Sequence, residues 1–159
     1  MKFSQYYNRY GKVLVMHTPL ISAFGKMRTL LETIGIDLEM YCGWRGEADQ
    51  NAALLLGTSK AKFGSSPHNY GLAFDCAPVE KGKLNWEVDE ATWLKIGMAG
   101  EKYGLQWGND WDGDGVPTAQ DKDEVNSKGA KLIQDRPHFQ IKGWQGMGFE
   151  LQKTSPPIG

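Results

Sequence analysis

The chain has 159 residues, of which 40% are hydrophobic and 23% charged, and its net charge is −1. These values are ordinary for one globular domain, and they exclude the disordered, fibrous and membrane-embedded classes of protein. The near-zero charge gives no reason to expect nucleic acid as a partner. We expect a single domain over 1–159, with a core over about 18–145 and a tail over 145–159.

The charge is unevenly distributed along the chain. Residues 110–124 contain six acidic side chains and one lysine, a local balance of −5, so the remainder carries about +4. A mildly basic body with one sharply acidic segment suits approach to an anionic polymer.

The N-terminal region contains no visible export or anchoring signal. Its apolar run, Val13–Met16, is too short for a signal-peptide core or a membrane span. We therefore expect synthesis in the cytoplasm without a signal peptide, and no membrane insertion. Cys42 and Cys76 lack metal-ligand spacing, and strand alternation would bury both, as free thiols or as a cross-strand disulfide.

Apolar spacing predicts the elements in chain order. A helix should begin with Thr18 as its N-cap and Pro19 in the first position, and it should end near Gly35. Its apolar positions recur every three or four residues, at Leu20, Phe24, Met27, Leu31 and Ile34. The other expected elements are strands over 38–42, 72–77, 105–107 and 137–141, and helices over about 47–56 and 90–103, with an irregular tail after residue 144.

Two of the three histidines fall in segments that combine an imidazole with a carboxylate. The first segment reads Ser66-x-His68-x6-Asp75, and the second reads Asp135-x-x-His138. In a strand over 72–77, Asp75 would point away from the apolar face, and His138 would do the same in the last strand. Two imidazoles and one carboxylate are the ligands of a catalytic zinc ion, and the second carboxylate could act as a base on its bound water. The sequence therefore predicts a zinc hydrolase.

These segments resemble the zinc D-Ala-D-Ala carboxypeptidase and L-alanyl-D-glutamate peptidase family, which is VanY-like, and within it the endolysins of tailed phages. The resemblance covers roughly residues 20–145. It includes Gly43-Trp44-Arg45, Gln50, the block Gly104–Trp111 and the block Asp135–Gln140. It implies a small α+β domain of the Hedgehog and D-Ala-D-Ala peptidase type, in which helices pack on one side of a small antiparallel sheet.

The same resemblance assigns roles to individual residues. It implies that zinc is bound by His68, Asp75 and His138, and that Asp135 is the general base. Arg45 would hold a substrate carbonyl or carboxylate. The alternatives are that Asp135 only orients a histidine and that Arg45 forms a surface salt bridge. Residues expected at the substrate are Ser66, Trp107, Trp111 and Gln140.

The implied function is cell-wall degradation by a bacteriophage endolysin, an antimicrobial enzyme that cuts the L-Ala-D-Glu bond of peptidoglycan stem peptides. Peptidoglycan is then the expected partner, the protein a monomer, and holin-type release its route from the host cytoplasm. The alternatives are a D,D- or L,D-carboxypeptidase that trims stem peptides, and a non-catalytic wall-binding protein with the same fold.

The chain departs from the family pattern in an apparent insertion over about 112–134. The segment 110–121 matches a calcium loop, with aspartate in place of the usual final glutamate. The expected ligands are Asp110, Asp112, Asp114, the Val116 backbone, Thr118 and Asp121. The alternative is a solvated acidic loop without an ion. If calcium binds, we expect it to order the loop and to hold the Asp135 segment; Asp110 also belongs to the block shared with the family.

Overall fold

We analysed a computed structural model that describes residues 2–118, 120–121, 124–130 and 132–159. In chain order the elements are β1 (Phe3–Tyr7), β2 (Val13–His17), α1 (Thr18–Glu32), β3 (Leu38–Cys42), α2 (Glu47–Leu55), η1 (Pro67–Tyr70), β4 (Ala73–Glu80), β5 (Lys83–Leu84), α3 (Glu90–Lys102), β6 (Leu105–Trp107), β7 (His138–Ile141) and η2 (Trp144–Gly146). Among the described residues, no helix combines the length and apolar character needed to cross a bilayer.

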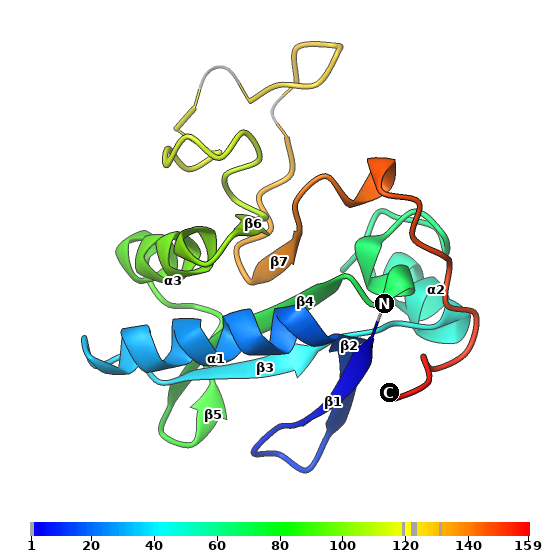
Figure 1. The fold of residues 1–159 in the computed structure, drawn as a ribbon. Coiled ribbons are helices and arrows are strands. Elements are labelled where there is room, and N and C mark those ends of the chain that lie inside the picture. The colour runs from blue at the N-terminus through cyan, green and yellow to red at the C-terminus, as the bar shows by residue number, and fades with distance from the viewer. Residues whose placement is uncertain (1, 119, 122–123, 131) are drawn as a thin grey trace.

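The main sheet is antiparallel and has the strand order β3-β4-β7-β6, with the short β5 paired to β4. β7 is the last strand along the chain, yet it lies between β4 and β6. A separate hairpin of β1 and β2 lies below this sheet in Figure 1. The predicted α+β class with a small antiparallel sheet is therefore confirmed.

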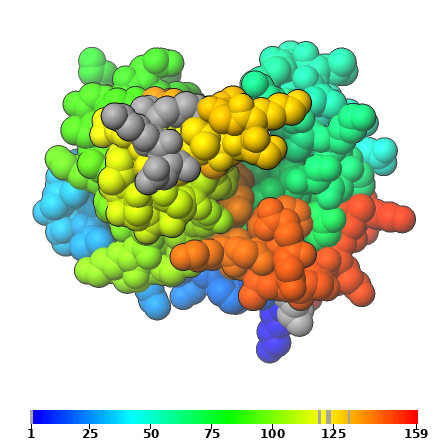
Figure 2. Space-filling model, turned by 90° about the horizontal axis from the view of Figure 1, so that it is seen from above, coloured from blue at the N-terminus to red at the C-terminus, as the bar shows by residue number. Residues whose placement is uncertain are grey.

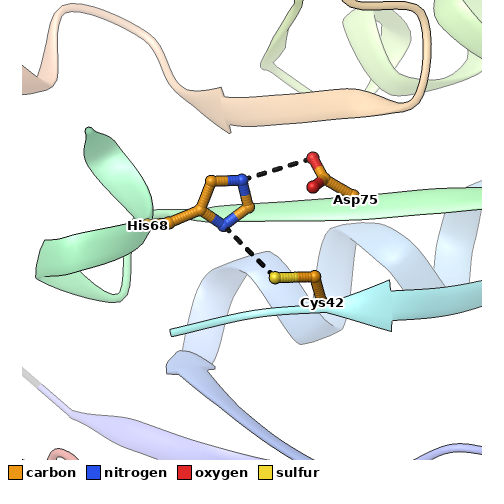
Figure 3. A group of neighbouring side chains, drawn as sticks. All are labelled: Cys42, His68 and Asp75. Carbon is orange, nitrogen blue, oxygen red and sulfur yellow. Dashed lines mark hydrogen bonds and ion pairs between the residues drawn. The ribbon is translucent and has the colours of Figure 1, made fainter. Parts of the chain in front are cut away.

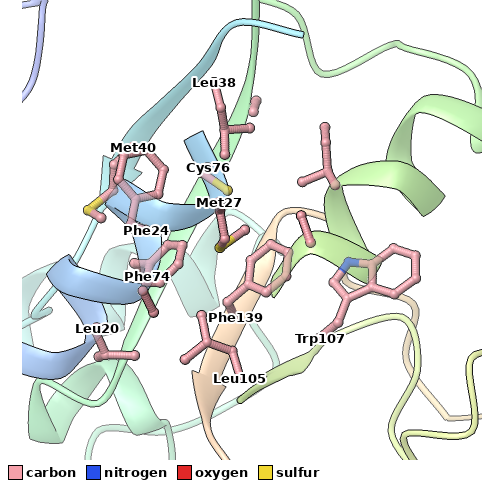
Figure 4. Close-up of a cluster of buried hydrophobic side chains, with 14 of the residues drawn as sticks. Leu20, Phe24, Met27, Leu38, Met40, Phe74, Cys76, Leu105, Trp107 and Phe139 are labelled. Carbon is pink, nitrogen blue, oxygen red and sulfur yellow. The ribbon is translucent and has the colours of Figure 1, made fainter. Parts of the chain in front are cut away.

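α1 and α3 cover one face of the sheet, and the core lies between them and the strands (Figures 1 and 4). The rings of Phe74 and Phe139 stack at 5.5 Å across neighbouring strands, and Phe24 of α1 meets Phe74 edge-on. On α3, Gly97 and Gly100 leave room for the rings of Trp107 and Phe139, which are fully buried. Since the helices and core occupy this face, the opposite face of the sheet is left for polar side chains.

The predicted elements are all present, with shifted ends. The N-cap position of α1 is occupied by His17, and Thr18 is already helical. The prediction of a Thr18 cap was wrong because β2 runs directly into the helix, leaving no turn between them. The helix ends at Glu32, and Gly35 then takes a left-handed conformation at φ 80° in the following turn. The strands β1, β2 and β5 were not predicted: β1 is mostly polar, β5 has only two residues, and the apolar run of β2, Val13–Met16, was considered only as a signal-peptide core or membrane span.

The tail is irregular, as expected, but it is anchored to the domain. The indole Nε1 of Trp44 donates to the Gln152 carbonyl oxygen at 3.0 Å, and the Gln152 amide donates to the Asn69 carbonyl oxygen at 3.1 Å. Ile158 forms a parallel bridge with Phe3 of β1. The tail therefore supports the segment that contains η1.

The acidic insertion joins β6 to β7 as a long excursion above the sheet (Figure 1). Its described residues form turns and bends without a helix or a long strand. Lys122 and Asp123, which contribute to the predicted charge of this segment, lie outside the described residues.

Gly97→Ala is expected to lower the free energy of unfolding by about 1–3 kcal/mol, because the new Cβ would overlap the buried Trp107 ring. Gly25→Ala on α1 is the matched control, since a Cβ there meets nothing within 4 Å. That variant should be neutral or more stable by up to about 1 kcal/mol. Urea denaturation of both variants measures the difference, and equal stabilities would contradict the packing described here.

Candidate metal centre

His68 is held by a short capped helix. In η1 the Ser66 hydroxyl accepts a hydrogen bond from the His68 amide at 3.2 Å. In the same cap, Asn69 Oδ1 accepts a hydrogen bond from the Ser66 amide at 3.3 Å. Gly71 ends the helix in the left-handed conformation, φ 71°. This Ser-Pro-His-Asn-Tyr-Gly sequence therefore places the imidazole at the start of β4, where it is 3% exposed.

Asp75 and His138 are cross-strand partners in β4 and β7. Asp75 Oδ1 lies 3.1 Å from His138 Nδ1 and 3.3 Å from His68 Nε2. The two imidazole rings are 5.0 Å apart between centroids. The structure thus brings the three predicted zinc ligands together on the polar face of the sheet, from three different elements.

The hydrogen bonds of each ring identify the nitrogen that is available to a metal. His68 Nδ1 donates to the Gly43 carbonyl at 2.8 Å, which leaves Nε2 facing Asp75. His138 Nε2 donates to Gln140 Oε1 at 2.8 Å, which leaves Nδ1 facing Asp75. Such partners fix the tautomer of a metal-binding histidine.

The contacts of Asp75 have the spacing of zinc ligands. Two ligand atoms on a tetrahedral zinc lie roughly 3.3 Å apart, given metal–ligand distances of about 2.0–2.1 Å. The separations of Asp75 Oδ1 from the two ring nitrogens are close to this value. The described ligands form two groups that share Asp75, one with His68 and Cys42 and one with His138 and Asp135, so a zinc ion bound by both histidines would draw the two rings closer together.

The electrostatics of the centre favour a bound cation. Burial alone would lower the pKa of His68, but the Asp75 carboxylate outweighs it and raises that pKa to about 10. Burial raises the pKa of Asp75, yet the two imidazoles hold it well below its ordinary value. The buried carboxylate therefore stabilises positive charge between the rings, as a metal ion or as a proton.

Asp135 lies at the open side of the centre. Its Oδ2 is 3.9 Å from His138 Nδ1, the nitrogen that faces Asp75, and its side chain is 47% exposed. Partial burial and the charge of Asp75 raise the pKa of Asp135. Its backbone is fixed beside the site, because its amide donates to the Gly108 carbonyl at 2.8 Å.

Arg45 lies at the other oxygen of Asp75. Arg45 Nη2 is 3.6 Å from Asp75 Oδ2, and its side chain is only 16% exposed. Its other guanidinium nitrogen, Nη1, donates to Gln50 Oε1 at 3.2 Å. Arg45 therefore does not form the exposed surface salt bridge that was the alternative. It is a mostly buried part of the site.

Cys42 corrects a sequence-based expectation. It is a free thiol, as expected, but its sulfur lies 4.0 Å from His68 Nδ1 and 3.7 Å from Arg45 Nη2 rather than in the core (Figure 3). A register shift between Met40 and Cys42 pairs Cys42 with Asp75, so the alternation that predicted burial fails at this point. Cys76 is fully buried and free, as predicted.

A hydrogen-bonded layer beneath the site was only partly predicted. Asn69 Nδ2 donates to the Arg45 carbonyl at 3.0 Å and to Gln50 Oε1 at 3.1 Å, and Gln50 is fully buried. Gly43 supplies the carbonyl that fixes His68; a Cβ there would lie 2.8 Å from the Val15 oxygen. The Gly43-Trp44-Arg45 motif and Gln50 are the sequence signals that indicated this layer.

The predicted substrate residues have different positions. Trp107 has no exposed surface and packs under α3, so the expectation that it contacts substrate was wrong. Ser66 and Gln140 are buried, and their side chains serve the η1 cap and His138 respectively. Trp111 is half-buried, and its ring centroid lies 6.2 Å from that of His138. Of these four residues, Trp111 is the one in position to contact a ligand.

The predicted calcium residues lie in the insertion above β6. Asp110, Asp112 and Asp114 come together there, and Glu124, which the loop pattern does not include, completes the group. Thr118 is buried and its hydroxyl donates to Glu124 Oε1, whereas the Val116 side chain is 40% exposed. Asp121 is buried nearby but is not a member of this group of four. Whether calcium binds stays a prediction at this point.

Comparison of the sequence with known proteins finds a family model and a curated relative. A peptidase family model described as D-alanyl-D-alanine carboxypeptidase matches residues 59–115, a segment that contains His68 and Asp75. The chain is 32% identical over 92 residues to the peptidoglycan L-alanyl-D-glutamate endopeptidase CwlK of Bacillus subtilis (strain 168). This match covers 48% of the chain and 55% of the relative's length, so the chain spans about half of the curated relative that it matches.

Two solved structures share the fold. The L-Ala D-Glu endopeptidase ChiX of Serratia marcescens superposes with a TM-score of 0.57 at 20% identity, over 82% of this chain and 83% of that one. The vancomycin resistance D,D-pentapeptidase VanY, in complex with Zn(II), superposes with a TM-score of 0.59 at 12% identity, over 89% and 80%. At these identities the likeness establishes the fold.

His68→Ala is expected to lower zinc affinity by at least about 100-fold, because one of three protein ligands is removed. His17→Ala is the matched control, since His17 packs against Phe3 and Phe149 away from the centre. Zinc content after dialysis, measured by elemental mass spectrometry, should be near one per chain in the control. Retention of zinc by His68→Ala would contradict the assigned centre.

Proposed function

Because the chain belongs to the VanY-like zinc peptidase family, as its motifs predicted, we propose that it is a zinc-dependent peptidase of peptidoglycan. The proposed reaction is hydrolysis of the L-Ala-D-Glu bond of stem peptides. The observation that carries the proposal is the buried Asp75 carboxylate between two imidazoles, with a half-exposed carboxylate beside it. The choice of bond is supported by CwlK and ChiX, which are both described as endopeptidases for this linkage.

His68 Nε2, Asp75 Oδ1 and His138 Nδ1 would hold the zinc ion. When bound, zinc supplies a water of pKa near 7 and a Lewis acid for the peptide carbonyl. The protein keeps both imidazoles oriented through Gly43 and Gln140, so that Nε2 of His68 and Nδ1 of His138 would face the metal.

Asp135 is the proposed general base. Its Oδ2 accepts the proton of the attacking water and then delivers it to the leaving amine nitrogen, which balances the hydrolysis. A carboxylate with a raised pKa is better matched to this exchange near neutral pH than an ordinary aspartate. Its position 3.9 Å from the metal-facing nitrogen of His138 suits a base that acts on a metal-bound water.

Arg45 is proposed to stabilise the oxygen of the reacting carbonyl or a substrate carboxylate. It lies at the site with its charge partly shared with Asp75 Oδ2, 3.6 Å away. Preorganised cations are most effective where negative charge develops in the transition state. The same contact keeps Asp75 oriented so that its Oδ1 faces the two rings.

A carboxypeptidase is the second candidate. The description of the matching family model and the fold likeness to a D,D-pentapeptidase favour removal of a terminal residue. A non-catalytic wall-binding protein is less well supported, because all four residues of the reaction are present in a connected site.

The biological setting is also a proposal. We propose that the protein is a monomeric phage endolysin, made in the host cytoplasm, that reaches peptidoglycan after holin-type release. The resemblance of its motifs to phage endolysins supports this. Cells to which the protein is added from outside should lyse only after their membrane has been permeabilised. Lysis of cells that express the protein, without permeabilisation of the membrane, would contradict this setting.

Digestion of purified peptidoglycan by the zinc-loaded protein should release stem peptides that begin with D-Glu. Mass spectrometry of the products, with a chelator-treated sample as control, measures this. Loss of a terminal D-Ala alone would establish the carboxypeptidase instead. The absence of any product in the zinc-loaded sample would leave only the non-catalytic protein.

Asp135→Asn should retain zinc and lower turnover of a stem peptide by about 10²–10⁴-fold, because the amide cannot accept the proton. Zinc content and kcat are measured on the same preparation. If Asp135 only orients His138, the variant should instead lose zinc affinity by about 10–100-fold. A fully active variant would remove the assigned base.

A further inference from the structure

A second group of carboxylates, here called the acidic cluster, lies in the insertion between β6 and β7. It consists of Asp110, Asp112, Asp114 and Glu124, and one oxygen from each residue lies within 4.8 Å of all the others. Figure 2 shows the insertion, in yellow and gold, facing the green segment around residues 60–70 across a hollow of the surface. The cluster is thus separate from the zinc centre but belongs to a segment beside it.

Two members of the acidic cluster are buried with an oxygen unsatisfied. Asp110 is fully buried and Glu124 is 2% exposed. Within the described part of the chain, Asp110 Oδ1 and Glu124 Oε2 have no hydrogen-bond partner. Buried carboxylate oxygens without donors are costly, so these two atoms indicate a missing positive ligand.

Among the described residues, the surroundings supply little of that charge. Partial burial and the neighbouring Asp110 carboxylate raise the pKa of Glu101 to about 8, so Glu101 adds a carboxyl group beside the cluster and no positive charge. Lys142 lines the same pocket as Glu101 and Asp110, but one ammonium group cannot balance four carboxylates.

The other oxygens of the cluster are organised by the loop backbone. Asp110 Oδ2 accepts from the Gly115 amide at 2.8 Å, and Asp114 Oδ1 accepts from the Val116 amide at 2.8 Å. Glu124 Oε1 accepts from the Trp111 amide and from the Thr118 hydroxyl, each at 2.7 Å. These three carboxylates are therefore held in place by one oxygen each, and in Asp110 and Glu124 the second oxygen has no partner among the described residues.

The donor set indicates the ion. Four carboxylates without nitrogen or sulfur suit a hard cation, and an irregular loop suits calcium better than magnesium, which requires near-octahedral geometry. We propose that the acidic cluster binds one calcium ion, with Glu124 as a ligand, and that this ion positions Trp111 beside the zinc centre.

Trp111 connects the two sites through three contacts. Its amide is bonded to Glu124, its indole Nε1 donates to the Ile133 carbonyl at 2.6 Å, and its ring lies beside His138. Ile133 is two residues before Asp135, so the backbone and side chain of Trp111 together connect the proposed calcium ligand Glu124 with His138 and with the segment of the proposed base. The Trp111 carbonyl also accepts from Gln106, whose Oε1 accepts from Gln140 at 3.4 Å.

The ion would therefore act as a regulator of the proposed peptidase. Without it, the four carboxylates repel one another, and Glu124 is released from Trp111. With it, Trp111 and the Asp135 segment are fixed in the positions described above. This regulatory role rests on the proposed function, whereas calcium binding itself does not.

The test is calorimetric titration of calcium into the chelated full-length chain, followed by tryptophan fluorescence. Wild type should bind one calcium ion more tightly than magnesium, with a fluorescence change that Trp111→Phe abolishes while binding persists. Glu124→Gln should lower calcium affinity by at least about tenfold. Glutamine can still accept the Trp111 and Thr118 bonds, so the variant should keep its fold. Glu87→Gln, an exposed acid outside the cluster, is the matched control.

Activity is measured separately on the zinc-loaded protein. Calcium should raise kcat/KM on a stem peptide about fivefold or more, and Glu124→Gln should need a higher calcium concentration for the same effect. The proposal would be overturned if wild type does not bind calcium. It would also be overturned if Glu124→Gln leaves the calcium affinity unchanged while Asp121→Asn lowers it. Binding without any change in Trp111 fluorescence would overturn the coupling. If no stem peptide is cleaved, the titration still decides calcium binding, so the two failures are distinguishable.

Discussion

The whole centre depends on one buried carboxylate. Asp75 Oδ1 lies within about 3.3 Å of both imidazoles, and Oδ2 faces the Arg45 guanidinium. Such a charge is costly to bury unless several partners surround it, so its neighbours must be held in place as firmly as the carboxylate itself. The elements around it meet this requirement. β4 is an interior strand, η1 is capped at both ends, and the tail is bonded to the segment that carries His68.

The strand pairing determines which groups face this carboxylate. β7 places His138 directly opposite Asp75, and the register shift in β3 brings Cys42 to the other side. The helices on the far face contribute only packing, through rings that occupy the spaces above Gly97 and Gly100. The chemistry and the core therefore use opposite faces of the same strands, and the period of two along each strand separates them.

The sequence predicted which residues lie together at the candidate metal centre, because they are arranged in two short segments with regular spacing. His68, Asp75, Asp135 and His138 were all placed where the structure has them, and strand alternation gave the orientations of Asp75 and His138.

Alternation failed for Cys42, since a bulge in one strand has no clear signature in the sequence. Trp107 was misplaced because aromatic residues near a motif can serve either the core or a cleft. Glu124 could not be predicted, because its approach to Asp110 depends on the path of an irregular loop. The first hairpin was missed because its first strand, Phe3–Tyr7, is mostly polar and its second strand is a continuous apolar run without the alternation of a half-exposed strand.

The position of β7 has a consequence for the order in which the molecule can assemble. This strand is made after every other strand, yet it lies between β4 and β6. During synthesis, β4 and the η1 segment are complete about sixty residues before His138 emerges. Until then the buried face of β4 lacks Phe139, and Asp75 lacks one of its two imidazoles. Long-range pairing of this kind is slow, because the intervening chain must first be closed into a loop. A nascent chain therefore holds an incomplete centre, and completion of the sheet and of the candidate metal centre become a single late event.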